Sequence, residues 1–134
     1  MATKQRVVER EGRQGMHDGR GQVLGYEFFT GETKGLMRFA DLVIEPGAYV
    51  GYHRHEGNLE ILYVLSGRAE HVLDGDRCTL EPGDAVLIQS GHAHAIRNTG
   101  DEGFRYLLVF AAIPTGEWGS VENLPLPEGV SDWA

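Results

Sequence analysis

The sequence predicts an all-β protein, built as a sandwich or a small barrel. Short apolar segments follow one another at close, even spacing, and polar turns that contain Gly, Asn, Asp or Pro separate them. The 19 glycines stand singly at such junctions, so they mark turns between strands and not a flexible linker. Before residue 112 no apolar pattern keeps a 3.6-residue period for three turns, so little helix is expected.

Nine strands are expected in the central part of the chain, where each apolar segment ends at a turn. They are Val23 to Phe29, Leu36 to Ile44, Tyr49 to His55, Leu59 to Leu65, Arg68 to Leu73, Arg77 to Leu80, Ala85 to Ile88, His94 to Arg97 and Phe104 to Ala111. The DGD sequence at residues 74–76 is a hairpin signal between two of them. We therefore expect one domain, with an N-terminal segment at 1–22, a barrel at 23–113 and a tail at 114–134.

The tail differs in composition from the rest of the chain. Three of the five prolines (Pro114, Pro125 and Pro127) and both tryptophans (Trp118 and Trp133) lie in it. Proline favours extended backbone, and tryptophan buries a large apolar area. We expect an extended segment, with little regular structure, that its aromatic side chains hold against the barrel.

Charge and cysteine content exclude several classes of partner and location. Twelve Lys and Arg against 20 Asp and Glu give a net charge of −8, which disfavours nucleic acid and anionic membrane surfaces as partners. No apolar run reaches the roughly 18 residues of a membrane span, and the N-terminus lacks the apolar core of a signal peptide. Cys78 is the only cysteine, as suits a reducing compartment. We therefore expect a soluble, cytoplasmic protein.

The stretch GYHRHEGNLE at residues 51–60 contains a possible metal site. On a strand, side chains alternate between faces, so His53 and His55 project to one side while Arg54 points to the other. After the EGN turn, a hairpin partner strand can bring Glu60 opposite the two imidazoles. Two histidines and one carboxylate leave coordination positions open on a divalent ion, which a catalytic metal requires. The alternative for these residues is a polar strand end.

The spacing around these ligands forms a longer pattern. Gly47 is followed by five residues and His53, then by one residue and His55. Four residues then precede Glu60, and six more precede Gly67.

A second pattern follows in GDAVLIQSGHAHAIRN, at residues 83–98. Gly83 is followed by five residues and Gln89, then by one residue and Gly91, two residues and His94, and three residues and Asn98. Together the two patterns resemble the two signature motifs of the cupin family, over roughly residues 36–111. The one departure is Gln89, which stands where the family commonly has proline and removes no ligand.

The resemblance implies a small antiparallel jelly-roll β-barrel that holds one divalent metal ion per chain. It implies that four side chains bind the ion: His53, His55, Glu60 and His94. It also implies catalytic roles for two of these ligands, Glu60 and His94. Three imidazoles and a carboxylate suit Mn, Fe, Ni, Co or Zn and are too rich in nitrogen for Mg or Ca. The sequence does not choose among these ions, and Mn is our first choice.

The family's pocket is lined from inside the barrel, and three further residues are candidates for this lining. Tyr49 has the strand parity of His53, so we expect it to face the pocket. Arg38, if it points inward, can bind a carboxylate or phosphate in bidentate fashion. Tyr106 is the third candidate.

The remaining histidines are given less specific expectations. His92 lies beside Gly91, where it is a candidate for contact with substrate at the pocket rim. We expect His71 to be either exposed or satisfied by a partner, and His17, in the charged N-terminal segment, to be solvated. Asn98 either orients a ligand or closes one end of the barrel.

Two functions are compatible with these features. The first is a metal enzyme on a small oxygen-rich substrate, such as a sugar, a sugar phosphate or an organic acid. The ion would act as a Lewis acid in an isomerase, lyase or decarboxylase reaction or, if it is Fe, in a dioxygenase reaction. Similar chains are often described as mannose-6-phosphate isomerase-like. The second is a cupin that binds a small molecule without catalysis, as a sensor or storage module.

The apolar content also indicates a homodimer. Bulky residues in YEFF at 26–29 and LVI at 42–44 occupy both faces of their strands. One small barrel interior cannot absorb all of them. We expect a second copy of the chain to cover an outer sheet face.

Overall fold

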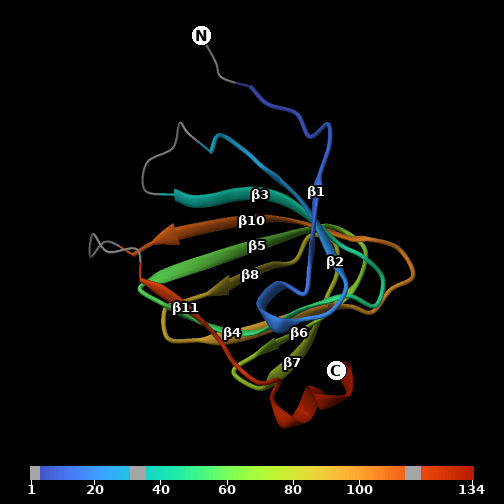
Figure 1. Cartoon of the computed structure of the whole chain (residues 1–134), viewed down its shortest axis with the longest axis vertical. Helices are drawn as coiled ribbons and strands as arrows, with labels where there is room; N and C mark the ends of the chain where they lie inside the picture. The colour runs from blue at the N-terminus through green and yellow to red at the C-terminus, as the bar shows by residue number, and fades with distance from the viewer. Residues whose placement is uncertain (1–3, 31–35, 114–118) are drawn as a thin grey trace.

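The structure is a computed structural model that describes residues 4–30, 36–113 and 119–134 (Figure 1). Two antiparallel sheets face each other. The first has the strand order β1-β2-β3-β10-β5-β8 and the second β11-β4-β9-β6-β7. In chain order the strands are β1 (Glu11–Gln14), β2 (Gln22–Glu27), β3 (Leu36–Ile44), β4 (Tyr49–Glu56), β5 (Asn58–Ser66), β6 (Ala69–Leu73), β7 (Asp76–Leu80), β8 (Ala85–Ile88), β9 (Ala93–Asn98), β10 (Phe104–Ala112) and β11 (Ser120–Asn123). The predicted all-β antiparallel jelly roll is confirmed.

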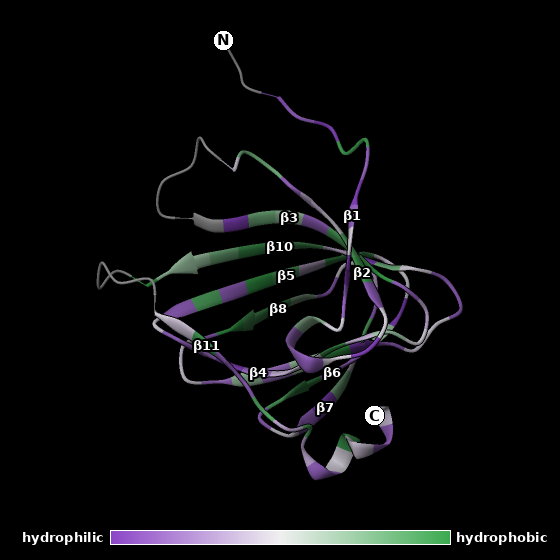
Figure 2. Cartoon of the chain, viewed as in Figure 1, coloured by the Kyte–Doolittle hydropathy of each residue, from purple (hydrophilic) through white to green (hydrophobic). Residues whose placement is uncertain are grey.

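Side chains that point inward from alternate strand positions fill the space between the two sheets. On β5, Glu60, Leu62 and Val64 point inward while Ile61 and Tyr63 point outward, as period two requires. Apolar side chains from both sheets, among them Ile44, Leu62 and Phe104, form one continuous core. In Figure 2, β8 and β10 are hydrophobic along most of their length, whereas β5 also carries hydrophilic positions.

All nine predicted strands are present, with ends that differ by at most two residues from those expected. Two further strands, β1 and β11, were not predicted. Their sequences, EGRQ and SVEN, have no buried position, so they lack the apolar alternation that marks a strand in sequence. They form because β2 and β4 offer backbone partners.

The tail contains more regular structure than expected, because β11 pairs with β4 and a 3₁₀ helix, η2 (Glu128–Trp133), follows. The expected aromatic anchor is present in Trp133. This side chain is 2% exposed, packs against Tyr49 with 5.9 Å between ring centroids, and donates from Nε1 to Glu70 Oε1 at 2.9 Å. Trp118, the other expected anchor, lies outside the described residues.

The connection between β4 and β5 differs from the expected hairpin. The two strands follow each other through Gly57, but β4 pairs with β9 and β11 while β5 pairs with β10 and β8. The chain therefore crosses from one sheet to the other at this turn. As a result, β4 and β5 face each other across the interior instead of lying side by side.

Asn98 closes one end of the sandwich. Its Nδ2 donates to the carbonyl oxygens of Ile44 at 2.8 Å and Glu102 at 2.7 Å, and its Oδ1 accepts from the N–H of Gly100 at 2.8 Å. Of the two roles left open by the sequence, these contacts fit the structural one.

In the described parts of the chain, no helix is long and apolar enough to cross a membrane.

Candidate metal centre

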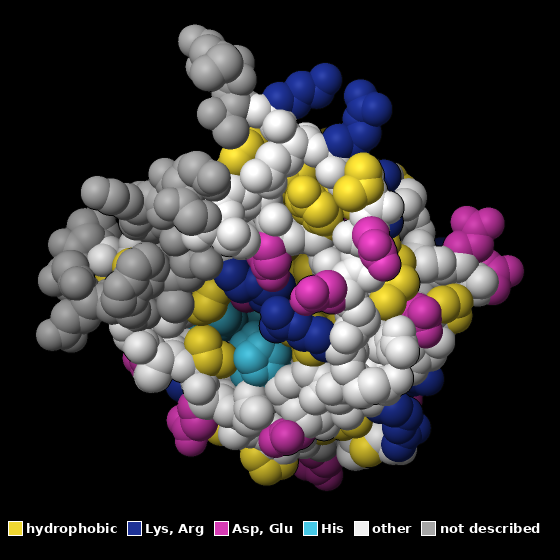
Figure 3. All heavy atoms as spheres, turned by 45° about the horizontal axis from the view of Figure 1, so that its top comes forward, with side chains coloured by type: hydrophobic (Ala, Val, Ile, Leu, Met, Phe, Trp, Pro, Cys, Tyr) yellow, Lys and Arg dark blue, Asp and Glu magenta, His cyan; other side chains and the backbone are white. Residues whose placement is uncertain are grey.

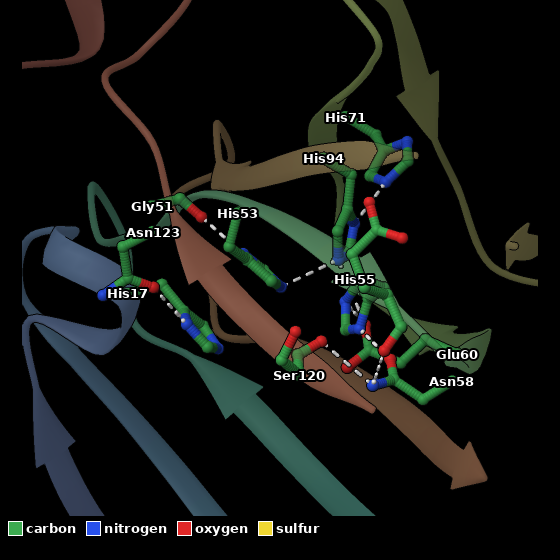
Figure 4. A network of polar contacts seen from close by, with 11 residues as sticks. His17, Gly51, His53, His55, Asn58, Glu60, His71, His94, Ser120 and Asn123 are labelled. Atoms are coloured by element: carbon green, nitrogen blue, oxygen red, sulfur yellow. Dashed lines mark hydrogen bonds and ion pairs between the residues drawn. The ribbon is translucent and has the colours of Figure 1, made fainter. Parts of the chain in front are cut away.

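Four buried side chains from three strands converge between the sheets (Figure 4). His53 and His55 come from β4 and His94 from β9, all in one sheet, whereas Glu60 comes from β5 in the other. One ligand atom of each lies within 4.8 Å of the others. The sequence predicted this set, although it placed Glu60 on a hairpin partner; the carboxylate instead reaches the imidazoles from across the interior.

The distances between the convergent nitrogen and oxygen atoms are suited to binding an ion. His94 Nε2 lies 3.1 Å from His53 Nε2 and 3.1 Å from Glu60 Oε1. His55 Nε2 is 3.6 Å from Glu60 Oε1 and is buried without a hydrogen-bond partner among the described residues. A buried polar atom without a partner is costly, and a divalent ion at this point would satisfy it. The donor set of three nitrogens and one carboxylate therefore fits a single transition-metal ion.

The other nitrogen of each β4 imidazole is held by a hydrogen bond. His53 Nδ1 donates to the Gly51 carbonyl oxygen at 2.7 Å, and His55 Nδ1 donates to Asn58 Oδ1 at 2.8 Å. Since an acceptor at Nδ1 places the proton there, Nε2 keeps its lone pair for a metal. Both rings are thus fixed in the tautomer that coordination requires.

His94 is oriented by another histidine. Its Nδ1 lies 2.9 Å from His71 Nε2, and His71, on β6, is 1% exposed. For His94 to present a free Nε2, its Nδ1–H must donate to His71, whose own proton then sits on Nδ1. Of the two expectations for His71, exposed or satisfied, the second is correct, and its partner is a metal-ligand candidate.

Burial keeps the imidazoles of His53 and His71 neutral. Burial, reinforced by the neighbouring His94, lowers the pKa of His53 to about 2 and that of His71 to about 3. For Glu60, burial acts to raise the pKa, but the neighbouring histidines, His94 above all, outweigh it and lower the pKa of the carboxyl. Neutral imidazoles beside an ionised carboxylate are the protonation states in which these groups bind metal.

The cluster lies in a cavity that opens at one face of the molecule. Figure 3 shows histidine side chains at the bottom of a hollow with Lys or Arg and acidic side chains at its edge. Two of the three predicted lining residues, Arg38 and Tyr106, border this cavity. Burial raises the pKa of the Tyr106 phenol. A larger hollow lies outside the barrel between β4 and the tail, and none of the four convergent residues lines it.

The expectation for Tyr49 is wrong. Val50, its neighbour, packs in the core between the sheets, while Tyr49 packs outside with Trp133. The register between β4 and β9 shifts between Val50 and His53, so one extra residue is inserted there. This β-bulge reverses the parity from which the inward position of Tyr49 was inferred.

His92 is not among the residues that line the cavity. Its Nδ1 contacts Asp74 Oδ2, and its side chain is 48% exposed.

The Gln89 carbonyl oxygen accepts from the His92 N–H at 3.2 Å, across a turn whose third residue is Gly91 at φ 91°. This turn therefore closes with glutamine at the position that is usually proline.

His17 is the site residue that the sequence did not reveal. It was expected to be solvated, but its ring stacks on that of His53 with 3.7 Å between centroids and it lines the cavity. Burial lowers the pKa of this imidazole. No spacing relates it to the two motifs, and its short 3₁₀ helix, η1 (Met16–Asp18), has no apolar periodicity.

We predict that the metal-free protein loses stability as the pH falls below about 6.5. The folded-state pKa values of about 2 for His53 and about 3 for His71 lie below the ordinary value of 6.5, so the unfolded chain binds more protons across this range. Each histidine should lower the free energy of unfolding by up to about 1.4 kcal/mol per pH unit. Urea denaturation of chelator-treated protein between about pH 7.5 and about pH 5 measures this slope.

A variant makes the test specific. His71→Asn should give a shallower pH dependence, because one buried imidazole is removed. A wild-type protein that is equally stable at both ends of this range would contradict the prediction.

This chain is similar to known proteins over the part that contains the cluster. A cupin domain matches residues 40–110, the part of the chain that contains all four convergent residues. An oxalate-binding protein of Thermotoga maritima is 38% identical over 71 residues, which cover 53% of this chain and 59% of that protein. A glucose-6-phosphate isomerase of Thermococcus gammatolerans is 30% identical over 106 residues, which cover 69% of this chain and 56% of that enzyme.

A solved structure extends the similarity to most of the fold. The crystal structure of a predicted oxalate decarboxylase from Thermotoga maritima superposes with a TM-score of 0.78 at 30% identity, and the match covers 84% of this chain and 100% of that one. In contrast, the chain spans little more than half the length of the two curated relatives, at 59% and 56%. The matched domain, the two facing sheets and the buried histidine–glutamate cluster show that this chain belongs to the cupin family.

Proposed function

We propose that this cupin holds one divalent transition-metal ion with His53, His55, Glu60 and His94, and that it acts on a small carboxylate bound at that ion. Mn is our first choice of metal. The observation that carries the proposal is the inward orientation of three Nε2 atoms toward Glu60, with one of them, that of His55, buried without a partner. The relatives described as oxalate-binding protein and predicted oxalate decarboxylase support a small acid as the ligand.

Arg38 supplies the charge that a carboxylate needs. It borders the same cavity as His53, Glu60 and His94. Glu27 Oε1 accepts from Arg38 Nε at 2.8 Å and from Nη2 at 2.5 Å, so the guanidinium is held while Nη1 makes no bond to the described residues. A guanidinium retained in this way can donate to an acid whose other end binds at the histidine cluster.

The size of the cavity supports a small ligand. The space available to the centres of water molecules inside it is about 20 Å³, which is room for about one or two waters. Among oxygen-rich ligands, a small acid therefore needs the least movement of the cavity walls. A sugar phosphate is larger and would need the cavity walls to move.

The chemistry divides between the ion and the chain. When bound, the ion would act as a Lewis acid toward the carboxylate, hydroxyl or carbonyl oxygens of the substrate. Glu60 offsets part of the ion's charge, and His53, His55 and His94 keep it away from bulk water. Arg38 orients the acid, and apolar neighbours such as Leu42 and Leu62 exclude water from it. A lyase, decarboxylase or isomerase reaction on a hydroxy or keto acid is the activity we propose.

A binding function without catalysis is the second candidate. It is favoured by the similarity to an oxalate-binding protein. Under this alternative the same four residues and Arg38 bind a small acid, and no bond of the acid changes. The two candidates differ in turnover alone, so turnover distinguishes them.

We also propose that the chain forms a homodimer through the outer face of the larger sheet. Phe39, Val109, Ile61 and Leu87 are direct cross-strand neighbours on β3, β10, β5 and β8. Ile61 is 41% and Leu87 46% exposed. Such an apolar row across four strands is typical of a surface that another subunit covers. Phe28, from the YEFF sequence, extends the row, with its ring centroid 5.0 Å from that of Phe39.

Replacing Glu60 by Gln should weaken metal binding and abolish turnover. The variant keeps the shape of the side chain but removes its charge, so Mn affinity should fall by about 10- to 100-fold while the fold is retained. Chelator competition followed by metal analysis measures this affinity. If the protein is an enzyme, turnover of small hydroxy or keto acids, followed by NMR, should remain absent when excess metal refills the site.

Glu56→Gln is the matched control, because Glu56 is exposed at the end of β4. It should bind Mn as the wild type does. A wild type that binds acids but converts none of them would favour the binding function. Undiminished turnover in refilled Glu60→Gln would show that Glu60 lacks the role proposed.

Replacing Arg38 by Met should weaken oxalate binding without affecting the metal. The variant keeps most of the apolar stem and loses the donors, so oxalate affinity of Mn-loaded protein should fall by about 10-fold or more. Titration calorimetry measures it, and Arg68→Met, at an exposed ion pair, is the control. Unchanged oxalate affinity in Arg38→Met would exclude Arg38 from the ligand site.

Light scattering at micromolar concentration should give about twice the chain mass of 14.8 kDa. The double change Ile61→Lys with Leu87→Lys places two charges in the apolar row and should give monomers. Val8→Lys, at an isolated position that is 82% exposed, should leave the mass unchanged. A wild-type mass near that of one chain would refute the dimer.

A further inference from the structure

His17 is held in a backbone conformation that histidine seldom adopts. It has φ 52° and ψ 44°, and Asp18, the next residue, has φ 61°. The left-handed region is unfavourable for residues with a Cβ, because this atom comes too close to the following carbonyl oxygen. Side chains kept in such a region are concentrated at ligand sites, where the surrounding structure enforces them.

Two glycines fix this turn directly on β4. A Cβ on Gly51 would lie 1.8 Å from the carbonyl oxygen of His17, and a Cβ on Gly19 would lie 2.0 Å from that of Tyr49. Arg20 and Tyr49 exchange both backbone hydrogen bonds immediately after the turn, at 3.0 and 2.8 Å. The turn is therefore a built part of the cavity wall and not a loose cover.

The imidazole of His17 is fixed by a stacking contact and a hydrogen bond. Its ring is 12° from parallel to that of His53, at 3.7 Å between centroids. Nδ1 lies 2.8 Å from Asn123 Oδ1, and Asn123 is the cross-strand neighbour of His53 on β11. In Figure 4, Asn123 lies on the side of the His17 ring that faces away from the other histidines. Nε2 is therefore the nitrogen left to meet a ligand in the cavity.

The hydrogen bond to Asn123 also sets what this nitrogen can do. An amide oxygen only accepts, so the proton of the neutral ring is on Nδ1 and Nε2 carries a lone pair. A lone pair repels a carboxylate oxygen but accepts from a hydroxyl. Arg38, on β3, donates into the same cavity and complements the carboxylate.

We propose that His17 determines specificity by accepting a hydrogen bond from a hydroxyl of the bound acid, so that the site takes small hydroxy carboxylates. This inference rests on the proposed function, since the acid binds at the metal cluster. His17 lies outside the four convergent residues and is not a ligand of the ion. It contacts the substrate instead, and Asn123 acts as the positioning residue that keeps its Nε2 unprotonated.

The test compares malonate with hydroxymalonate, two acids that differ by one hydroxyl. Mn-loaded wild type should bind hydroxymalonate about 3- to 10-fold more tightly than malonate, as one added hydrogen bond provides. His17→Phe keeps the ring that stacks on His53 but lacks the acceptor. In this variant the two affinities should agree within about twofold, with malonate binding and Mn uptake as in the wild type.

A second variant and a control guard against an effect on folding. Asn123→Ala frees the ring of His17 and should reduce the preference for hydroxymalonate without removing malonate binding. His92→Phe, at an exposed histidine outside the cavity lining, should keep the full preference.

The outcomes separate this inference from the proposed function. If wild type binds malonate and hydroxymalonate equally, or if His17→Phe keeps the preference, His17 does not read the hydroxyl and the inference is wrong while carboxylate binding stands. If Mn-loaded wild type binds neither acid, the proposed function fails and the inference falls with it.

Discussion

Three buried imidazoles cannot share the interior of a small barrel with a carboxylate unless every ring nitrogen has a partner. Here each Nδ1 is satisfied within the protein, by the Gly51 carbonyl, by Asn58 and by His71. The Nε2 atoms are then directed toward one another and toward Glu60. This leaves one point in the described interior where His55 Nε2, which has no partner, lies beside the other ligand atoms, and a divalent cation there would satisfy them together.

The same constraint explains why the site depends on the whole fold. The imidazoles belong to one sheet and the carboxylate to the other, so the site exists only when the two sheets are packed face to face. That packing is provided by the apolar core, with Phe104 and Ile44 among its fully buried members. An ion bound between the sheets would in turn favour the closed sandwich, because the unfolded chain offers no preformed site.

The sequence predicted those parts of the structure that depend on local spacing. His53 and His55 could be placed on one face because no irregularity lies between them, and the turn glycines marked the strand ends. Tyr49 was misplaced because a bulge between Val50 and His53 cannot be read from composition. The partners of His71 and His17 were not predicted for a different reason, since neither residue has a fixed spacing from the motifs. His71 meets His94 through the pairing of β6 with β9, and His17 stacks on His53 from the turn η1.

These differences separate two layers of the site. The motif residues of β4, β5 and β9 provide an ion-binding set, which is compatible with many reactions because fold and ligands alone do not define a substrate. Selectivity must come from groups that touch the substrate on the open side of that set. In this chain Arg38, Tyr106 and His17 line the cavity beside the set, and they come from β3, β10 and the turn before β2. Together they place a cation, a phenol and an acceptor nitrogen around one small cavity. Under the proposals above, these groups would select an acid that carries a hydroxyl, which the metal ligands alone would not distinguish from other acids.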